Sequence, residues 1–148
     1  MNNLKNLLRL AVKAAVFAGK EILEVYDGDD FQVTSKDDKS PLTLADRKAH
    51  EKIMFFLKDT DIPVLSEEGK HLPYEQRKHW DYFWLVDPLD GTKEFIKRNG
   101  EFTVNIALMK KDSPVAGVIY VPCKKTLYFA NGDQGAYKIE DIEFDDFY

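Results

Sequence analysis

The chain has 148 residues, of which 44% are hydrophobic and 13% aromatic, enough for one folded domain with a sizeable core and too many for a disordered chain. Its net charge is −5, but five acidic residues fall within the last nine positions, and the other 21 acidic residues balance the 21 Lys and Arg residues. A neutral body lacks the basic surface that nucleic-acid polymers require, so nucleic-acid binding is excluded.

Cysteine content and hydropathy limit the environment of the protein. The single cysteine, Cys123, excludes an intrachain disulfide and a cysteine-based zinc site. No apolar run approaches the ~20 residues of a membrane span. The N-terminus mixes Leu with Lys, Arg and Asn where a signal peptide has an unbroken apolar block. We therefore expect no membrane span and a cytoplasmic location.

Two amphipathic helices are predicted in the first part of the chain. Apolar residues recur at three- and four-residue steps from Asn3 to Tyr26, which predicts a long helix that ends at Asp27-Gly28. A short strand is expected at Phe31–Thr34, and a polar loop from Ser35 to Pro41 follows it. The second helix is predicted from Thr43 to Lys58.

The rest of the chain is rich in short strand patterns. Strands are predicted at Pro63–Ser66, Tyr82–Val86, Phe102–Leu108, Val115–Val121, Thr126–Ala130 and Ala136–Ile139. A turn after Asp87 leads into a short helix from Thr92 to Arg98. Two helices followed by an antiparallel meander favour a single α+β domain over residues 1–148, with two long helices layered on a mainly antiparallel sheet.

The segment WLVDPLDGT, residues 84–92, carries the strongest chemical signal. A buried strand is expected to deliver Asp87 at its end, with Asp90 three residues later and the backbone carbonyl of Leu89 as a third oxygen. Such donors suit Mg²⁺, which one or two carboxylates commonly hold together with substrate phosphate. Gly91 and Thr92 open a helix whose N-terminal amides would bind an anion. The alternative is that these residues only form and cap a turn.

Further acidic residues lie near two other element ends. Glu67 and Glu68 follow the strand Pro63–Ser66, where they are either solvated or, because strand ends gather in one layer, part of the same site. Asp46 either completes a helix-start capping box with Thr43 or orients a hydroxyl or a water at that site.

Several other assignments are excluded or carry no function. Haloacid dehalogenase-type phosphatases use Asp-x-Asp-Gly-Thr, and the place of their nucleophile is taken here by Pro88, which disfavours an aspartyl-phosphate. A calcium-binding EF-hand needs oxygen ligands at alternate positions, which this segment lacks. The three histidines, at positions 50, 71 and 79, show no ligand spacing and are expected to be surface or helix-face residues. Lys93, Lys97 and Arg98 either form a solvated helix face or steer an anionic substrate.

The motif Asp-Pro-(Ile/Leu)-Asp-Gly-Thr is the first signature of the inositol monophosphatase superfamily, and residues 87–92 match it in full. The continuation, KEF at 93–95 and NGEFTVNI at 99–106, resembles the 3′(2′),5′-bisphosphate nucleotidases more than the inositol phosphatases. The Ser-Glu-Glu and Thr-x-x-Asp patterns also follow the family order, so the resemblance spans nearly the whole chain. It implies the N-terminal domain of the inositol monophosphatase-like sugar-phosphatase fold.

The resemblance also implies a role for each site residue. Glu67 would bridge a metal ion and the nucleophilic water, Asp87 would be a shared bidentate ligand, the Leu89 carbonyl a ligand, and Asp90 a ligand of the second metal. Thr92, hydrogen-bonded to Asp46, would polarise the water, and the amides of Gly91 and Thr92 would hold the phosphate close to Glu67, Leu89 and Asp90. The cofactor would be Mg²⁺, with two or three ions in the complete enzyme and inhibition by Li⁺.

The implied reaction is removal of the 3′-phosphate of adenosine 3′,5′-bisphosphate to give AMP, which clears a by-product of sulfate activation. The alternatives are an inositol monophosphatase and a non-catalytic phosphate-binding fragment. The family also has a metal-binding Asp in a Trp-Asp-x-Ala-Ala-Gly segment of a C-terminal α/β domain, and Trp80-Asp81 does not match it. We therefore expect that domain to be absent and the chain to be little active alone. We also expect an uncovered apolar surface that favours self-association.

Overall fold

A computed structural model of the chain describes residues 3–28, 40–69 and 72–147. The strand predicted at Phe31–Thr34 and most of the loop after it lie outside the described residues. None of the helices in the described segments combines the length and hydrophobicity that a bilayer crossing requires.

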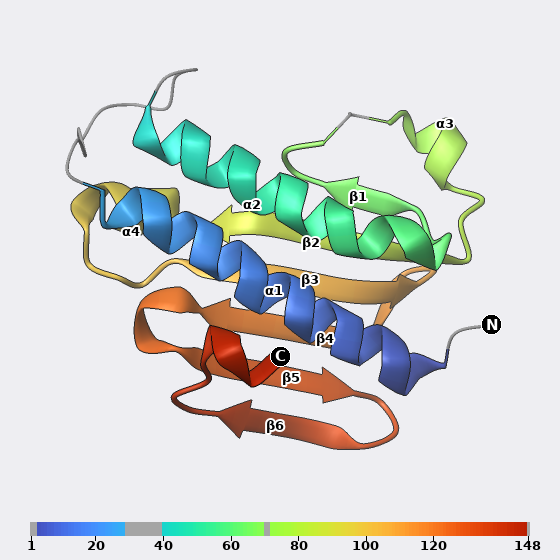
Figure 1. Ribbon diagram of the computed structural model, residues 1–148. Helices are drawn as coiled ribbons and strands as arrows, with labels where there is room; N and C mark the ends of the chain where they lie inside the picture. Colours follow the sequence, from blue (N-terminus) through green and yellow to red (C-terminus); the bar gives the residue numbers. More distant parts are fainter. Residues whose placement is uncertain (1–2, 29–39, 70–71, 148) are drawn as a thin grey trace.

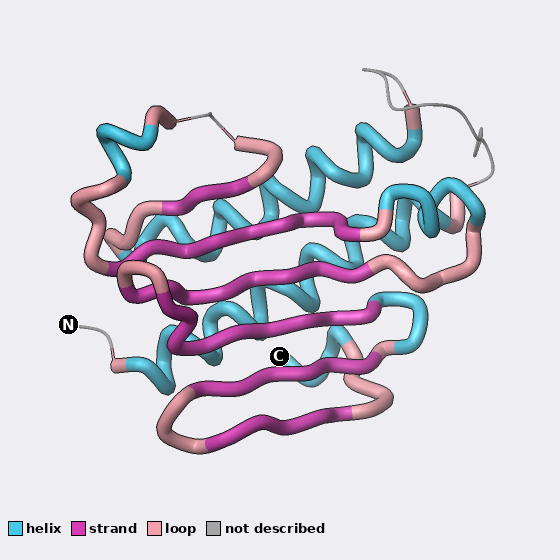
Figure 2. The backbone as a smooth tube through the Cα atoms, turned by 180° about the vertical axis from the view of Figure 1, so that it is seen from behind, coloured by secondary structure: helices cyan, strands magenta, loops and turns pink. Residues whose placement is uncertain are grey.

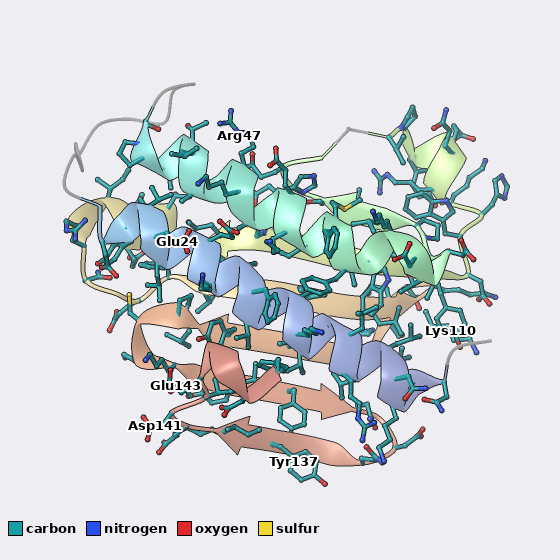
Figure 3. The ribbon with its side chains drawn as sticks, viewed as in Figure 1. Glu24, Arg47, Lys110, Tyr137, Asp141 and Glu143 are labelled. Carbon is teal, nitrogen blue, oxygen red and sulfur yellow. The ribbon has the colours of Figure 1, made fainter. Side chains whose placement is uncertain are left out.

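Helix α1, Leu4–Tyr26, has the extent that its periodicity predicts. The Asn3 side chain caps it by accepting a hydrogen bond of 2.8 Å from the amide of Asn6. At the other end the amide of Asp27 donates to the carbonyl of Leu23 over 2.9 Å, which closes the last turn. The helix is buried along one side and exposes charged residues such as Glu24 on the other (Figure 3).

Helix α2, Pro41–Leu57, begins two residues before the predicted start and continues into a 3₁₀ turn, η1, at Lys58–Thr60. Its N-cap is Ser40, whose hydroxyl oxygen accepts a hydrogen bond of 3.1 Å from the amide of Thr43. Pro41 fits the first helical position because no amide partner is needed there. The capping-box alternative for Thr43 and Asp46 is therefore wrong, and Asp46 lies in the second turn of the helix.

Six strands of the described segments form one sheet, and their spatial order follows the chain order. They are β1 Val64–Ser66, β2 Tyr82–Asp90, β3 Thr103–Lys110, β4 Ser113–Val121, β5 Thr126–Asn131 and β6 Gly135–Ile139. Strands β1 and β2 are parallel, and all the other pairs are antiparallel. The connections include the short helices α3 Tyr74–Arg77 and α4 Thr92–Lys97 and the 3₁₀ turns η2 Pro122–Lys124 and η3 Phe144–Phe147. The α+β prediction is confirmed.

Helices α1 and α2 lie side by side on one face of the sheet, and the core fills the space between the two layers (Figure 1). Alternate strand residues point into this core, as the predicted pattern of β3 requires: Val104, Ile106 and Leu108 are buried. Seen from behind, the other face of the sheet carries no helix among the described residues (Figure 2). The domain is thus a two-layer sandwich with one open side.

Close packing of α1 on the sheet depends on Gly19. A Cβ atom at this position would lie 2.4 Å from Cε2 of Tyr120 and 3.2 Å from Cγ of Pro122. We expect Gly19→Ala to lower the free energy of unfolding by about 1 kcal/mol, because the ~1–3 kcal/mol of overpacking exceeds the ~1 kcal/mol gained in helix propensity. Thermal melts followed by circular dichroism test this, with Gly132→Ala as the control because nothing lies within 4 Å there. A higher melting temperature for Gly19→Ala would contradict it.

Candidate functional site

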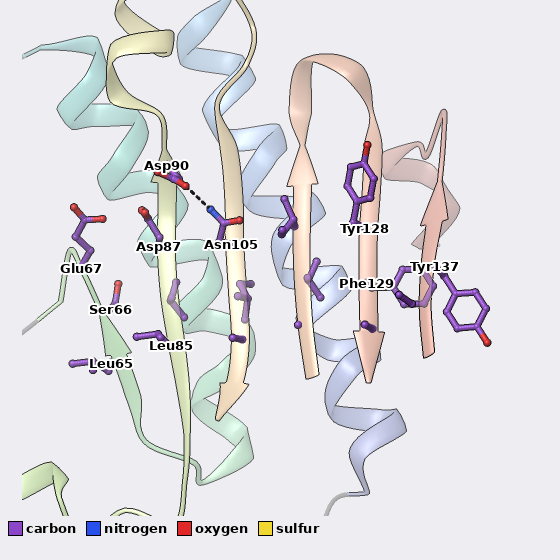
Figure 4. A pocket seen from close by; sticks show the side chains of 18 of the residues that line it. Leu65, Ser66, Glu67, Leu85, Asp87, Asp90, Asn105, Tyr128, Phe129 and Tyr137 are labelled. Carbon is purple, nitrogen blue, oxygen red and sulfur yellow. Dashed lines mark hydrogen bonds between the residues drawn. The ribbon is translucent and has the colours of Figure 1, made fainter. Parts of the chain in front are cut away.

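A β-bulge in β2 brings the two motif aspartates to one face of the sheet. The strand does not end near Asp87, as predicted, but continues to Asp90. Asp87 pairs with Asn105 and Asp90 with Thr103, so three steps along β2 match two along β3. In a regular strand, residues three apart point to opposite faces, and the extra residue of the bulge restores the same face. The expectation of a turn at this point is therefore wrong, while the predicted convergence of the two carboxylates is confirmed (Figure 4).

The parallel pairing of β1 with β2 places Glu67 beside Asp87. Ser66, the last residue of β1, pairs with Val86, and the amide of Glu67 donates to the Val86 carbonyl over 3.2 Å. Glu67 directly follows β1, and Asp87 lies next to Val86 within β2. The two carboxylates therefore lie side by side and line one groove (Figure 4). The expectation that Glu67 lies at the same site as Asp87 is confirmed.

Asp46 approaches the same group from the helical layer. It is only 2% exposed, and α2 packs on β2, so its negative charge acts on Asp87 through the protein interior. Among the described residues no hydrogen bond joins Asp46 to Thr92, so their pairing stays a prediction.

Asp87 is the electrostatic centre of the group. Burial, the adjacent Glu67 carboxyl, and the negative charges of Asp90 and Asp46 together raise its pKa to about 7, with burial as the largest cause. Its Oδ1 atom is buried, and no N–H or hydroxyl group of the described residues donates a hydrogen bond to it. An uncompensated carboxylate oxygen surrounded by three other carboxylates needs either a proton or a cation.

The donor set fits a hard divalent cation. In the described part of the chain no three His, Cys, Asp or Glu side chains are already arranged so that they could hold a metal ion. Mg²⁺ does not need such a cage, because one or two carboxylates, waters and substrate phosphate commonly complete its octahedron. Asp87, Asp90 and Glu67 would supply the carboxylates, and we expect their side chains to adjust when an ion binds.

Gly91 connects the bulged strand to α4. Its φ of +97° and a Cβ position 3.2 Å from the Cα of Phe102 leave room only for glycine. Its carbonyl accepts the amide of Phe95 over 3.0 Å, so it serves as the N-cap. Thr92 follows as the first, exposed residue of the helix, and the Leu89 side chain is buried behind the strand. The predicted strand, glycine and short helix are therefore present.

Asn105 belongs to the site although sequence reasoning missed it. Its Nδ2 donates 3.2 Å to Oδ2 of Asp90 and 3.0 Å to Oγ1 of Thr103, and the first bond fixes the Asp90 carboxylate (Figure 4). The signal was present in the sequence, because the alternation of β3 turns Asn105 away from the buried Val104 and Ile106.

The remaining polar residues divide into structural and exposed ones. The Arg98 guanidinium donates to the Tyr26 carbonyl over 2.8 Å and lies 4.4 Å from the centre of the Tyr26 ring, so it fastens α4 to α1. Lys93 and Lys97 are exposed on α4. His79, which follows α3, is also exposed. His71 lies outside the described residues. His50, expected to be a surface or helix-face residue, is half-buried on α2 and contacts Ser66.

A groove of about 980 Å³ extends from the carboxylates across the open face of the sheet. One residue of each strand forms a row across it, in the order Leu65, Leu85, Ala107, Gly117, Ala130 and Ala136. The next row runs from Asp87 and Asn105 to Ile119 and Tyr128, so a polar end passes into an apolar surface.

Comparison with known proteins identifies the family to which this chain is similar. The family model described as "Inositol monophosphatase family" matches residues 3–144. The 3′(2′),5′-bisphosphate nucleotidase CysQ of Salmonella typhimurium is 52% identical over 127 residues, which cover 84% of this chain and 51% of that protein. The Escherichia coli K12 protein of the same name is 55% identical over 116 residues, 76% of this chain and 47% of that one.

Solved structures of the same family have a similar fold. The crystal structure of CysQ from Bacteroides thetaiotaomicron superposes with a TM-score of 0.90 at 56% identity, covering 94% of this chain and 51% of that one. An inositol monophosphatase from Anabaena gives a TM-score of 0.76 at 26% identity, covering 93% and 48%. The chain thus spans about half the length of the relatives it matches. Since the family model covers nearly all of it and the signature aspartates converge as the resemblance requires, the chain belongs to the inositol monophosphatase family.

Proposed function

We propose that this chain provides the metal- and phosphate-binding part of a 3′(2′),5′-bisphosphate nucleotidase. The observation that carries the proposal is the buried, uncompensated Asp87 oxygen amid the carboxylates of Glu67, Asp90 and Asp46. The relatives named as bisphosphate nucleotidases favour this substrate class, because they reach 52–56% identity against 26% for the Anabaena inositol monophosphatase. The reaction would remove the 3′-phosphate of adenosine 3′,5′-bisphosphate and leave AMP.

The proposed division of work follows the geometry. Asp87, Asp90, Glu67 and the Leu89 carbonyl would hold the cations, and the amides of Gly91 and Thr92 would hold the phosphate. Thr92, with Asp46, would orient the attacking water, and Glu67 would take part in positioning it. When bound, Mg²⁺ would supply the Lewis acid that makes water a nucleophile at neutral pH and offsets charge on the leaving oxygen. Asn105 would keep the Asp90 carboxylate in place.

Further expectations follow from the same assignment. Li⁺ would inhibit the reaction, and the reaction would clear a by-product of sulfate activation in the cytoplasm. Because the chain spans half of its relatives, we also propose that it binds Mg²⁺ weakly and hydrolyses little when it is alone.

Calorimetric titration of Mg²⁺, and of Mn²⁺ as the tighter probe, tests the assignment in the presence and absence of inorganic phosphate. We expect binding that strengthens when phosphate is present. Phosphate binding that is independent of the metal would instead favour the non-catalytic fragment. A complete relative that hydrolyses inositol monophosphate faster than adenosine 3′,5′-bisphosphate would favour the inositol monophosphatase alternative.

The open sheet face is proposed to make the chain self-associate at high concentration. Leu85, Ile119 and Tyr128 lie along the groove with 42%, 46% and 42% of their surfaces exposed, and a contiguous apolar surface of this kind favours association. We expect sedimentation velocity to show concentration-dependent dimers that Ile119→Lys abolishes. Phe55→Lys makes the same change on α2, outside this face, and should leave the dimers intact. Dimers that survive Ile119→Lys would contradict the assignment of the surface.

A further inference from the structure

His50 links helix α2 to the end of strand β1. It lies four residues after Asp46, so both side chains are on the same face of the helix. Its Nδ1 atom is 3.0 Å from Oγ of Ser66, and Ser66 is 9% exposed. A buried hydroxyl needs hydrogen-bond partners. We therefore interpret this contact as a hydrogen bond that connects α2 to the end of β1.

The Ser66 hydroxyl also holds the turn that carries the acidic pair. Its oxygen accepts the amide of Glu68 over 3.3 Å, while the Ser66 carbonyl accepts the amide of Gly69 over 3.2 Å. A hydroxyl that accepts from an amide can donate its own proton to Nδ1 of a neutral imidazole. Burial lowers the pKa of His50, which favours that neutral form. Imidazole, hydroxyl and amide therefore make a continuous hydrogen-bonded chain from α2 into the turn.

The turn in question, residues 66–69, contains Glu67. The Glu67 backbone is held on one side by the Val86 carbonyl of β2 and on the other by the turn that Ser66 closes. We propose that His50 is a positioning residue, which acts through Ser66 to fix Glu67 relative to Asp46 and Asp87. The catalytic meaning of this arrangement rests on the function proposed above, whereas the positioning itself does not.

Hydrogen exchange of backbone amides tests the positioning without any metal. In His50→Leu and in Ser66→Ala we expect the amides of Glu68 and Gly69 to exchange about tenfold faster, measured by NMR on the full chain, because the hydrogen-bonded chain is broken. His50→Asn should restore slow exchange, since its side-chain amide places a polar atom where Nδ1 was. The double variant His50→Leu/Ser66→Ala should exchange no faster than either single one.

Thr60→Val provides a matched control for general loss of stability. Thr60 is buried, and its hydroxyl accepts the indole N–H of Trp84 over 3.1 Å and donates to the Leu57 carbonyl over 2.7 Å. The same oxygen accepts the amide of Ile62 over 3.3 Å, so the change removes internal hydrogen bonds, all of them away from the turn. Exchange at Glu68 and Gly69 should not accelerate selectively in this variant. Unchanged exchange in His50→Leu, or equal acceleration in Thr60→Val, would overturn the proposal.

Mn²⁺ affinity gives the second measurement. We expect binding about tenfold weaker in His50→Leu and Ser66→Ala, because residues that orient metal ligands typically change affinity by about 10–100-fold, and unchanged binding in Thr60→Val. Wild-type affinity in His50→Leu would overturn the positioning role while leaving the proposed function standing. A wild-type chain that binds no Mn²⁺ would count against the proposed function, and the exchange data would then decide the role of His50.

Discussion

Replacing Asp87 by Asn should make the metal-free protein more stable while it removes the metal response. The raised pKa of Asp87 shows that burial and three neighbouring carboxylates disfavour its ionised form. Asn has nearly the same shape without the charge. At pH 8 we expect a gain of about 1–2 kcal/mol, since each pKa unit corresponds to ~1.4 kcal/mol and a half-buried group requires a discount for solvent screening. The melting temperature should rise by about 3–6 °C.

The loss of metal affinity in Asp87→Asn should be a larger effect than the gain in stability. Asp87 would hold the cation directly, so its removal should weaken Mn²⁺ binding by about 100-fold or more, beyond what changes around a ligand usually cause. Calorimetry and thermal melts with and without Mn²⁺ measure both effects in one variant. Asp81→Asn makes the same chemical change at an exposed position just before β2 and should alter neither. An Asp87→Asn protein that melts lower than wild type without metal would contradict this account of the site.

The stability of the metal-free chain should also fall as the pH rises toward 7. The pKa of Asp87 is about 7 in the folded protein, against 3.8 as its ordinary value. Between these values the folded state keeps a proton that the unfolded state has released, so this carboxyl stabilises the fold fully below about pH 4 and no longer above about pH 7. A bound divalent cation would replace the proton, and its stabilising effect should therefore be greatest above pH 7.

The difference between wild type and Asp87→Asn isolates this contribution from that of all other carboxylates. We expect urea unfolding at pH 5, 6, 7 and 8 to show the variant gaining on the wild type at each step, with most of the change complete by pH 7. Adding Mg²⁺ at pH 8 should close the gap, because only the wild type binds it. A difference in unfolding free energy that stays constant over this range would contradict the raised pKa.

Sequence periodicity was sufficient for most of the fold. The three- and four-residue spacing in α1 and the strict alternation in β3 each specify one buried face, and both elements form as predicted. The start of α2 was misplaced because Thr43 and Asp46 have the right spacing for a capping box, whereas Ser40 followed by Pro41 is the pair that the helix uses.

The sequence was sufficient to predict most of the site residues, but not the backbone geometry and contacts that bring them together. Asp87 and Asp90 were recognised from the Asp-Pro-Leu-Asp-Gly-Thr motif and Glu67 from the Ser-Glu-Glu pattern. Pro88 indicates a turn, however, and sequence alone does not reveal that the pairing of β2 with β3 resumes after it. Asn105 and His50 were missed because their roles depend on contacts between elements distant in the chain, 15 residues to Asp90 and 16 to Ser66. The alternation of β3 indicates to which face Asn105 points, but local spacing does not identify the residue that it contacts.

The agreement between strand order and chain order has a consequence for how the protein folds. From β2 to β6 each strand pairs with the next one along the chain, so these contacts close short loops at little entropic cost. Helix α1 instead packs against β4, whose residues come roughly a hundred positions later, and contacts so distant form slowly. Strands β2 to β6 are therefore the part of the chain that can assemble first. The packing of α1 on β4 comes later and completes the hydrophobic core.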